Sequence, residues 1–198
     1  RIQDRLPTAY IIGYAALGEL TFWCDSRALV PRSPLMSVIH EGYSPWFNQA
    51  TPLRIVDVCC GGGSLGLLAA YHSPESHVLL LDIDADALAL AGTNRRDQGM
   101  GNTLCVQADL LEALAPSSVD IILANPPYVD AEDMANLPQE YHHEPRLALA
   151  AGDDGLDLVH RLLRQASLVL SPHGMLFLEV GNSAPALASS YPGLTFIW

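Results

Sequence analysis

The chain has 198 residues, 49% of them hydrophobic, which fits one α/β domain of ordinary size. Its cationic residues are ten arginines and no lysine, against 22 acidic residues, so the formal net charge is −12. The lack of lysine excludes Schiff-base, phosphate-loop and general-base lysines, and the negative charge argues against nonspecific binding to nucleic acids or anionic membranes.

Residues 1–50 are expected to form a hairpin and an approach helix that lead into the main domain. Turn signals at residues 18–19 and 25–26 separate short apolar stretches, which predicts a small hairpin. The prolines at 31 and 34 predict a rigid approach to a helix near residues 35–41. No apolar run approaches the roughly 20 residues of a membrane span.

Residues 51–198 alternate short apolar strands with helical segments, the pattern of a doubly wound, mostly parallel sheet. Asp84 and Asp154 are expected helix N-caps, and Gly99 and the run Pro172-His173-Gly174 are expected to end those two helices. The expected strands are 54–58, 77–82, 103–107, 119–124 and 175–180, and the other expected helices are 64–71 and 183–190. Residues 194–198 are expected to begin a sixth strand, so the chain is expected to be cut at both ends, without the closing strands of the sheet.

A glycine-rich loop follows the first expected strand of the sheet. Gly61, Gly63 and Gly66 match G-x-G-x-x-G between a strand and a helix, where glycine lets the backbone turn tightly and approach a ligand. Asp82, at the end of the second strand, can accept hydrogen bonds from ribose hydroxyls. Together they predict a cofactor that contains adenosine; the alternative is a turn that only packs the helix against the strand.

The same loop contains Gly62-Gly63-Ser64-Leu65-Gly66, the G-x-S-x-G pattern of an α/β-hydrolase nucleophile elbow. Asp153 and His173 follow in the chain order that such a triad needs. This hypothesis is the weaker one, because an elbow needs an oxyanion-hole loop from an earlier core strand. It also leaves Asp82 and the next motif without a role.

That motif is Asn125-Pro126-Pro127-Tyr128, directly after the fourth expected strand, at the edge where α/β sheets place their chemistry. The two prolines donate no backbone hydrogen bond and fix φ, so the loop is stiff and its carbonyls only accept. Asn125 adds a side-chain acceptor and Tyr128 an aromatic face, which together describe a clamp for a planar –NH₂ group. Beside an adenosine cofactor, such a clamp predicts methyl transfer from S-adenosylmethionine by alignment, without a lysine base.

These residues together resemble the protein-(glutamine-N5) methyltransferase family, whose members methylate a glutamine side-chain amide in translation proteins. Residues 131–138, 150–157 and 179–183 are closer to the branch that acts on a large-subunit ribosomal protein than to the release-factor branch. The resemblance covers nearly the whole chain and implies a class I (Rossmann-like) S-adenosylmethionine-dependent methyltransferase. It rests on Val30-Pro31-Arg32-Ser33-Pro34, Asp57-x-x-x-Gly61-x-Gly63, Asp82, Ala108-Asp109-Leu110, Asn125-Pro126-Pro127-Tyr128 and Glu144-Pro145.

The resemblance also implies a role for each matching residue. The cofactor would be bound by Asp57, Cys59, Cys60, Gly61, Gly62, Gly63 and Asn125, with Asp82 on the ribose and Asp109 and Leu110 at the adenine. The glutamine amide would be held by Asn125, Pro126, Pro127 and Tyr128. Arg32 and Glu144 either position the substrate segment or are halves of structural ion pairs. Cys60 and Gly62 depart from the usual family residues, and the N-terminal helical domain of the family is not expected within these 198 residues.

The acidic residues gather near the proposed clamp. Twelve lie between Asp97 and His160, where Arg146 is the one arginine. This favours a basic protein partner, such as a ribosomal protein, over nucleic acid or a membrane; the alternative is a merely solvated surface.

Four other functions stay open: methylation of a release factor, amino-methylation of adenine or guanine, a nicotinamide dehydrogenase, and a catalytically silent cofactor-binding module. A dehydrogenase would leave the Asn125–Tyr128 motif unused. No metal site is expected, because the adjacent His142 and His143 point apart and the cysteines lack C-x-x-C spacing. Cys24, Cys59, Cys60 and Cys105 are expected to be reduced thiols of a cytoplasmic protein.

Overall fold

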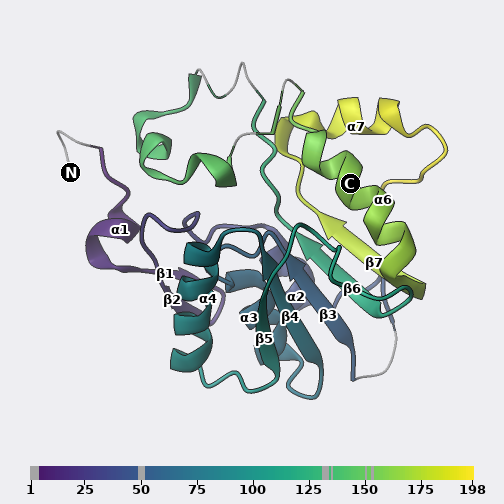
Figure 1. Cartoon of the computed structure of the whole chain (residues 1–198), viewed down its shortest axis with the longest axis horizontal. Coiled ribbons are helices and arrows are strands. Elements are labelled where there is room, and N and C mark those ends of the chain that lie inside the picture. The colour runs from purple at the N-terminus through teal and green to yellow at the C-terminus, as the bar shows by residue number, and fades with distance from the viewer. Residues whose placement is uncertain (1–4, 49–51, 131–133, 135, 150, 153) are drawn as a thin grey trace.

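A computed structural model describes residues 5–48, 52–130, 134, 136–149, 151–152 and 154–198. Figure 1 shows a central sheet with helices on both faces and a small hairpin beside it. The strands are β1 (Tyr14–Leu17), β2 (Leu20–Trp23), β3 (Arg54–Val58), β4 (His77–Asp82), β5 (Thr103–Gln107), β6 (Val119–Ala124) and β7 (Leu170–Leu178). The helices are α1 (Thr8–Ile12), α2 (Leu35–His40), α3 (Ser64–His72), α4 (Ala85–Asp97), α6 (Asp157–Val169) and α7 (Ala184–Ser190), with 3₁₀ turns η1 (Gln139–His143), η2 (Arg146–Ala148) and η3 (Gly181–Ser183).

The central sheet has the order β5-β4-β3-β6-β7, and each neighbouring pair in it is parallel. The chain builds outward from β3 to β5 and then crosses back to place β6 on the other side of β3. Val58 and Ala124, the last residues of β3 and β6, are register partners. The loops after these strands therefore emerge side by side at the switch point, where open α/β sheets bind their ligands.

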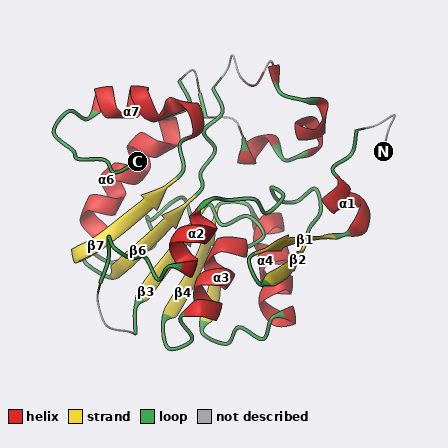
Figure 2. Ribbon diagram, turned by 180° about the vertical axis from the view of Figure 1, so that it is seen from behind, coloured by secondary structure: helices red, strands yellow, loops and turns green. Residues whose placement is uncertain are grey.

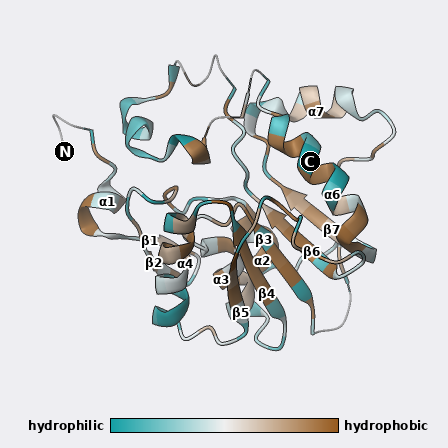
Figure 3. Cartoon of the chain, viewed as in Figure 1, coloured by the Kyte–Doolittle hydropathy of each residue, from teal (hydrophilic) through white to brown (hydrophobic). Residues whose placement is uncertain are grey.

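Both faces of the sheet are apolar because helices cover both. All six residues of β6 are buried, and Figure 3 colours the central strands as hydrophobic. Ile55 and Ile121 belong to the cluster that also holds residues of the hairpin, α2 and α3. Figure 2 shows α2 and α3 in front of the sheet. Val56 and Ile122 face the opposite cluster, which holds α6.

Most of the predicted elements are confirmed, including the hairpin, the approach helix and the first four strands of the sheet. Asp84 caps α4 by accepting a hydrogen bond from the backbone N–H of Asp86 at 2.8 Å, and Gly99 follows that helix with a positive φ of 66°. Within the described residues, no helix combines the length and apolar character needed to cross a membrane.

Three local predictions are wrong. Asp154 does not cap α6, because the helix begins at Asp157 and the Asp154 carboxylate instead accepts from the N–H of Leu156 at 2.9 Å. Residues 172–174 lie inside β7 and do not end the helix. The register between β6 and β7 is irregular between Val119 and Ile121, and residues 172–174 form a bulge there. Residues 194–198 form no strand, because they pair with none of the described strands, and Trp198 is 69% exposed.

Candidate active site

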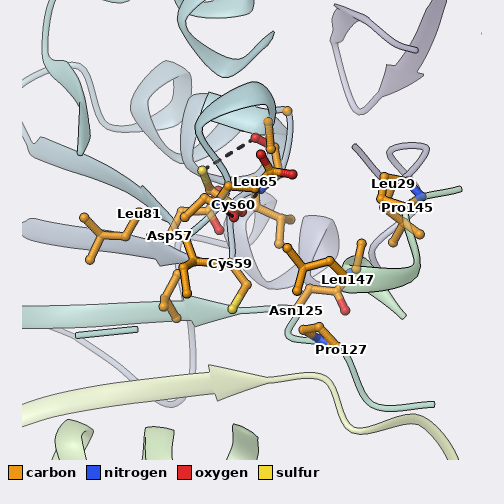
Figure 4. A pocket seen from close by; sticks show the side chains of 18 of the residues that line it. Leu29, Asp57, Cys59, Cys60, Leu65, Leu81, Asn125, Pro127, Pro145 and Leu147 are labelled. Atoms are coloured by element: carbon orange, nitrogen blue, oxygen red, sulfur yellow. Dashed lines mark hydrogen bonds between the residues drawn. The ribbon is translucent and has the colours of Figure 1, made fainter. Parts of the chain in front are cut away.

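A cleft lies at the carboxyl ends of β3, β4 and β6 and encloses about 1130 Å³ when open solvent is included. A concave site at this edge of an α/β sheet is where such folds bind their ligands. Figure 4 shows Asp57 and Cys59 on one side of this cleft and Pro145 and Leu147 on the other. The sequence-predicted residues that line it are Arg32, Asp57, Cys59, Cys60, Gly61, Gly62, Asp82, Asp109, Leu110, Asn125 and Pro127.

The glycine loop after β3 is held against the end of β4. The N–H of Cys60 donates to the carbonyl of Leu81 at 3.0 Å, and the N–H of Gly61 donates to Oδ2 of Asp82 at 2.8 Å. Gly61 and Gly63 have positive φ values of 53° and 81°, which explains why the loop needs glycine at these two positions. These two hydrogen bonds hold the loop against the end of β4 beside the cleft.

Asp82 has its carboxylate partly engaged by this loop. Oδ2 accepts from Gly61, and Oδ1 accepts from the N–H of Asp84 at 3.0 Å. Burial raises the pKa of Asp82, while these backbone hydrogen bonds oppose that rise. Because each carboxylate oxygen has two lone-pair sites, the Asp82 carboxylate can still accept a further donor such as a ribose hydroxyl.

Asp57 is the buried acid of the site, with 1% of its surface exposed. Its Oδ2 accepts from the backbone N–H of Gly66 in α3 at 2.8 Å. Burial raises the pKa of Asp57 to about 7, helped by the nearby charge of Asp82 and opposed by the Gly66 hydrogen bond.

This shift predicts a pH dependence of stability. The folded protein binds a proton at Asp57 more tightly than the unfolded chain, whose pKa is 3.8, so the free energy of unfolding falls as pH rises toward and through 7. In Asp57→Asn the side chain does not titrate but still offers an acceptor to Gly66. We expect the fall in the free energy of unfolding between pH 5 and 8 to shrink by on the order of 2 kcal/mol in urea denaturation. Some slope should remain, because burial also raises the pKa of Asp82 and Glu179; an unchanged slope would contradict the assignment.

The motif after β6 stands at the far side of the same cleft. Asn125 is half-buried and lines the cleft with Pro127, whereas Pro126 is buried and does not line it. The half-buried Tyr128 lies outside the cleft lining, and a Cβ atom on Gly181 would be 2.8 Å from its ring carbons Cδ2 and Cε2. The Tyr128 ring therefore packs directly on the backbone of Gly181.

This contact gives a specific prediction. Gly181 has a positive φ of 49°, and an alanine Cβ there would displace the Tyr128 ring. We expect Gly181→Ala to lower any catalysis that needs Tyr128 at least tenfold while changing affinity for the cofactor less than threefold, which calorimetry and initial rates can compare. Gly193→Ala is the control, because a Cβ there meets no atom within 4 Å. Equal losses in both variants would contradict the role of the contact.

Arg32 and Glu144 turn out to be partners of each other. Their ion pair is 2.8 Å long, and the side chain of Glu144 is 1% exposed while that of Arg32 is 39% exposed. Glu144 also accepts from the N–H of Val30 at 3.0 Å, and the Arg32 guanidinium lies 4.7 Å from the centre of the Tyr141 ring. The buried Glu144 thus fastens residues 30–32 to the segment of η1 and η2, and Arg32 alone of the pair reaches the cleft.

Two contacts at the site were not predicted from the sequence. Ser33 donates a hydrogen bond to the half-buried carboxylate of Glu179, which follows β7, and burial raises the pKa of Glu179. Arg161 of α6 lines the cleft and pairs with Asp109 at 2.7 Å. Ser33 and Glu179 both belong to motifs on which the family resemblance rests, but nothing in the sequence indicates that they contact each other.

The hydrolase hypothesis does not fit the geometry. Ser64 begins α3 at the carboxyl edge of the sheet, whereas His173 lies in the β7 segment beside the amino end of β6. The two residues are thus at opposite ends of the sheet. Asp153 lies outside the described residues, as do residues 131–133, 135 and 150 of the branch-specific motifs.

Comparisons with known proteins agree with this fold. The family model of the methyltransferase small domain matches residues 45–152. The ribosomal protein uL3 glutamine methyltransferase of Xanthomonas campestris pv. campestris is 42% identical over the whole chain, and the chain covers 64% of it. The protein of that name from Bordetella pertussis is also 42% identical, with 67% of its length covered. The chain therefore spans about two thirds of the length of these curated relatives.

Two solved structures share the architecture at low identity. The catalytic domain of hMettl16 in complex with MAT2A 3′UTR hairpin 1 has a TM-score of 0.65 at 19% identity, covering 84% of this chain and 63% of that one. A SAM-dependent methyltransferase from Agrobacterium tumefaciens has a TM-score of 0.54 at 19% identity, covering 83% and 51%. The predicted class I fold is confirmed.

Proposed function

The chain belongs to the methyltransferase small domain family, among the ribosomal protein uL3 glutamine methyltransferases, and we propose that it methylates the side-chain amide nitrogen of a glutamine in a ribosomal protein, with S-adenosylmethionine as methyl donor. Residues 51–198 form the methyltransferase domain, and residues 1–50 supply the hairpin and approach helix.

One observation carries the proposal: the residues expected to bind a nucleoside cofactor and the residues expected to bind an amide line the same cleft. Asp82 and the glycine loop line it from β3 and β4, and Asn125 and Pro127 line it from β6. A dehydrogenase would need the first half and would leave the second without a role. A transfer reaction needs both halves to bring two molecules together.

The residues present suit S-adenosylmethionine. Asp82 lines the cleft, and its carboxylate can accept a ribose hydroxyl in addition to its backbone donors. Asp57, Cys59 and Asp82 line the cleft from the ends of the neighbouring strands β3 and β4, and the loop that contains Cys59 would hold the methionine part of the cofactor. Asp109 lines the cleft and forms an ion pair with Arg161, which also lines it. Asp109 and Leu110 would contact the adenine.

The clamp formed by residues 125–128 would act by aligning the amide nitrogen with the methyl group. When bound, S-adenosylmethionine supplies an electrophilic methyl on a sulfonium. The side-chain carbonyl of Asn125 in the cleft lining and the backbone carbonyl of the adjacent Pro126 would accept the two amide hydrogens. These bonds would turn the nitrogen lone pair toward that methyl and disperse the developing positive charge. Pro127 keeps the loop stiff, and Tyr128, which packs on Gly181 outside the cleft lining, would place its ring beside the bound amide. The methylated nitrogen is acidic and loses its proton without a strong base.

The partner we propose is a basic protein, because ribosomal proteins are basic and this chain has a net charge of −12. A nucleic acid would need a positively charged groove, and residues 97–160 contain a single arginine, Arg146. The cytoplasm is the proposed location, supported by the uL3 substrate in the relatives' names and by the free thiols of the four cysteines.

Two measurements test this function. Calorimetry should show binding of S-adenosylmethionine and none of NAD; the reverse result would contradict the proposal. Labelled methyl donor is then added with ribosomal protein uL3, with a release factor, or with ribosomal RNA as acceptor. Label should enter a glutamine of uL3, and preferential labelling of the RNA or of the release factor would overturn the assignment of substrate.

A further inference from the structure

Three side chains of metal-binding type meet on the surface formed by the hairpin, α2 and α3. Glu19 lies in the turn between β1 and β2, His40 is the last residue of α2 and His72 is the last residue of α3. Oε1 of Glu19 is 3.2 Å from Nδ1 of His40, and its Oε2 is 3.2 Å from Nε2 of His72. The three ligand atoms all lie within 4.8 Å of one another.

The fold holds these residues together from three separate elements. α2 and α3 pack against each other, and their two histidine rings meet edge to face with centres 5.3 Å apart. The turn between β1 and β2 packs against the same two helices. A Cβ on Gly18 in this turn would lie 3.2 Å from Leu68 of α3 and 3.7 Å from Met36 of α2. The cluster is thus a product of tertiary packing and not of a local motif.

The cluster is separate from the methyltransferase site. α3 begins at the glycine loop and runs nine residues away from it, which puts its last residue about 13 Å from its start. None of Glu19, His40 and His72 lines the cleft. The proposed methyl transfer therefore does not use these three side chains.

Their chemistry matches zinc better than a hard cation such as Mg²⁺ or Ca²⁺. Imidazole nitrogen and carboxylate oxygen are both zinc ligands, with bonds of about 2.0–2.2 Å, so neighbouring ligand atoms of a tetrahedral site lie about 3.3 Å apart. Both Glu19–His distances are close to that length, but each is made by a different carboxylate oxygen. One ligand atom from each residue lies within 4.8 Å of the other two, so a small rotation of the exposed Glu19 carboxylate brings one oxygen to both imidazoles. A hard cation such as Mg²⁺ would prefer oxygen ligands throughout. One carboxylate and two neutral imidazoles also leave the ion a net positive charge, which suits a strongly acidic protein.

We propose that Glu19, His40 and His72 bind one Zn²⁺ ion, with water in the fourth position. The ion fastens the β1–β2 hairpin to the ends of α2 and α3. Because Zn²⁺ binds the folded chain at a site that the unfolded chain does not preform, it stabilises the native state.

The test is calorimetric titration of the full chain with Zn²⁺ under reducing conditions, followed by thermal denaturation with and without the ion. We expect one equivalent to bind and the Tm to rise by several degrees. Glu19→Gln and His40→Ala should each weaken binding at least tenfold and remove the rise in Tm. His40 is 64% exposed on its side chain, so its removal leaves the packing intact.

His173→Ala is the matched control, because His173 is exposed and lies on β7, away from the cluster. This variant should bind Zn²⁺ as the unchanged chain does. The proposal is overturned if no Zn²⁺ binds, or if the Glu19 and His40 variants bind it undiminished, which would assign the ion to cysteines or other histidines. Replacement by Co²⁺ gives a second readout, since an intense visible absorption that His40→Ala abolishes reports tetrahedral ligation by these residues.

Discussion

Replacing Asn125 by alanine is expected to reduce methyl transfer at least a hundredfold while changing the affinity for S-adenosylmethionine less than threefold. We propose that the side-chain carbonyl of Asn125 is the acceptor that orients the amide nitrogen, and removal of one such preorganised group typically costs about 10²–10³ in rate. The cofactor contacts we propose come from many other residues of the cleft, among them Asp82 and the glycine loop. Initial rates with saturating donor and calorimetry of donor binding measure the two effects separately.

Two further variants separate the acceptor from the surrounding structure. Asn125→Asp keeps an oxygen acceptor and should retain more activity than alanine. Tyr128→Phe keeps the ring that packs on Gly181 and removes a hydroxyl whose pKa burial raises, so its rate should stay within a few-fold of the unchanged enzyme. If Asn125→Ala keeps more than a tenth of the activity, or loses donor binding as well, the clamp does not work as proposed.

The central sheet could be predicted because its strands carry their own signals. The strand of residues 119–124 is a continuous apolar run apart from Asp120, and it ends at Asn125 and two prolines, so both its burial and its end were visible. The parallel arrangement then brought Asp82, the glycine loop and Asn125 to one edge. This part of the site follows from local pattern and topology together.

What could not be predicted depends on contacts between distant residues. The pair of Arg32 and Glu144 joins positions 112 residues apart in the sequence, and a charged pair of that separation has no local signal. The same holds for Glu19, His40 and His72, which only the packing of α2 and α3 brings together. The bulge at residues 172–174 of β7 was mistaken for a helix end, because Pro and Gly favour both and only the register with β6 decides.

The second large effect is expected at Gly66, where alanine should lower the free energy of unfolding by about 3 kcal/mol. A Cβ there would lie 2.2 Å from Cδ2 of Leu80 and 2.8 Å from Cβ of Asp57. Leu80 is fully buried, and Asp57 is held in β3 by pairing on both sides, so neither neighbour can yield cheaply. Displacing α3 would also stretch the hydrogen bond from the N–H of Gly66 to Asp57.

Gly92 provides the matched comparison, because it too lies inside a helix but a Cβ there would meet only the guanidinium of Arg96 at 3.6 Å. Gly92→Ala should raise the free energy of unfolding by up to about 1 kcal/mol, since alanine favours the helix and glycine does not. Urea denaturation of both variants separates a general effect of glycine in helices from close packing of α3 on β3 and β4. If the urea midpoints of both variants moved in the same direction, close packing at Gly66 would not explain the effect. Gly66, the third glycine of the loop motif, would then have no packing role in placing Asp57 at the cleft.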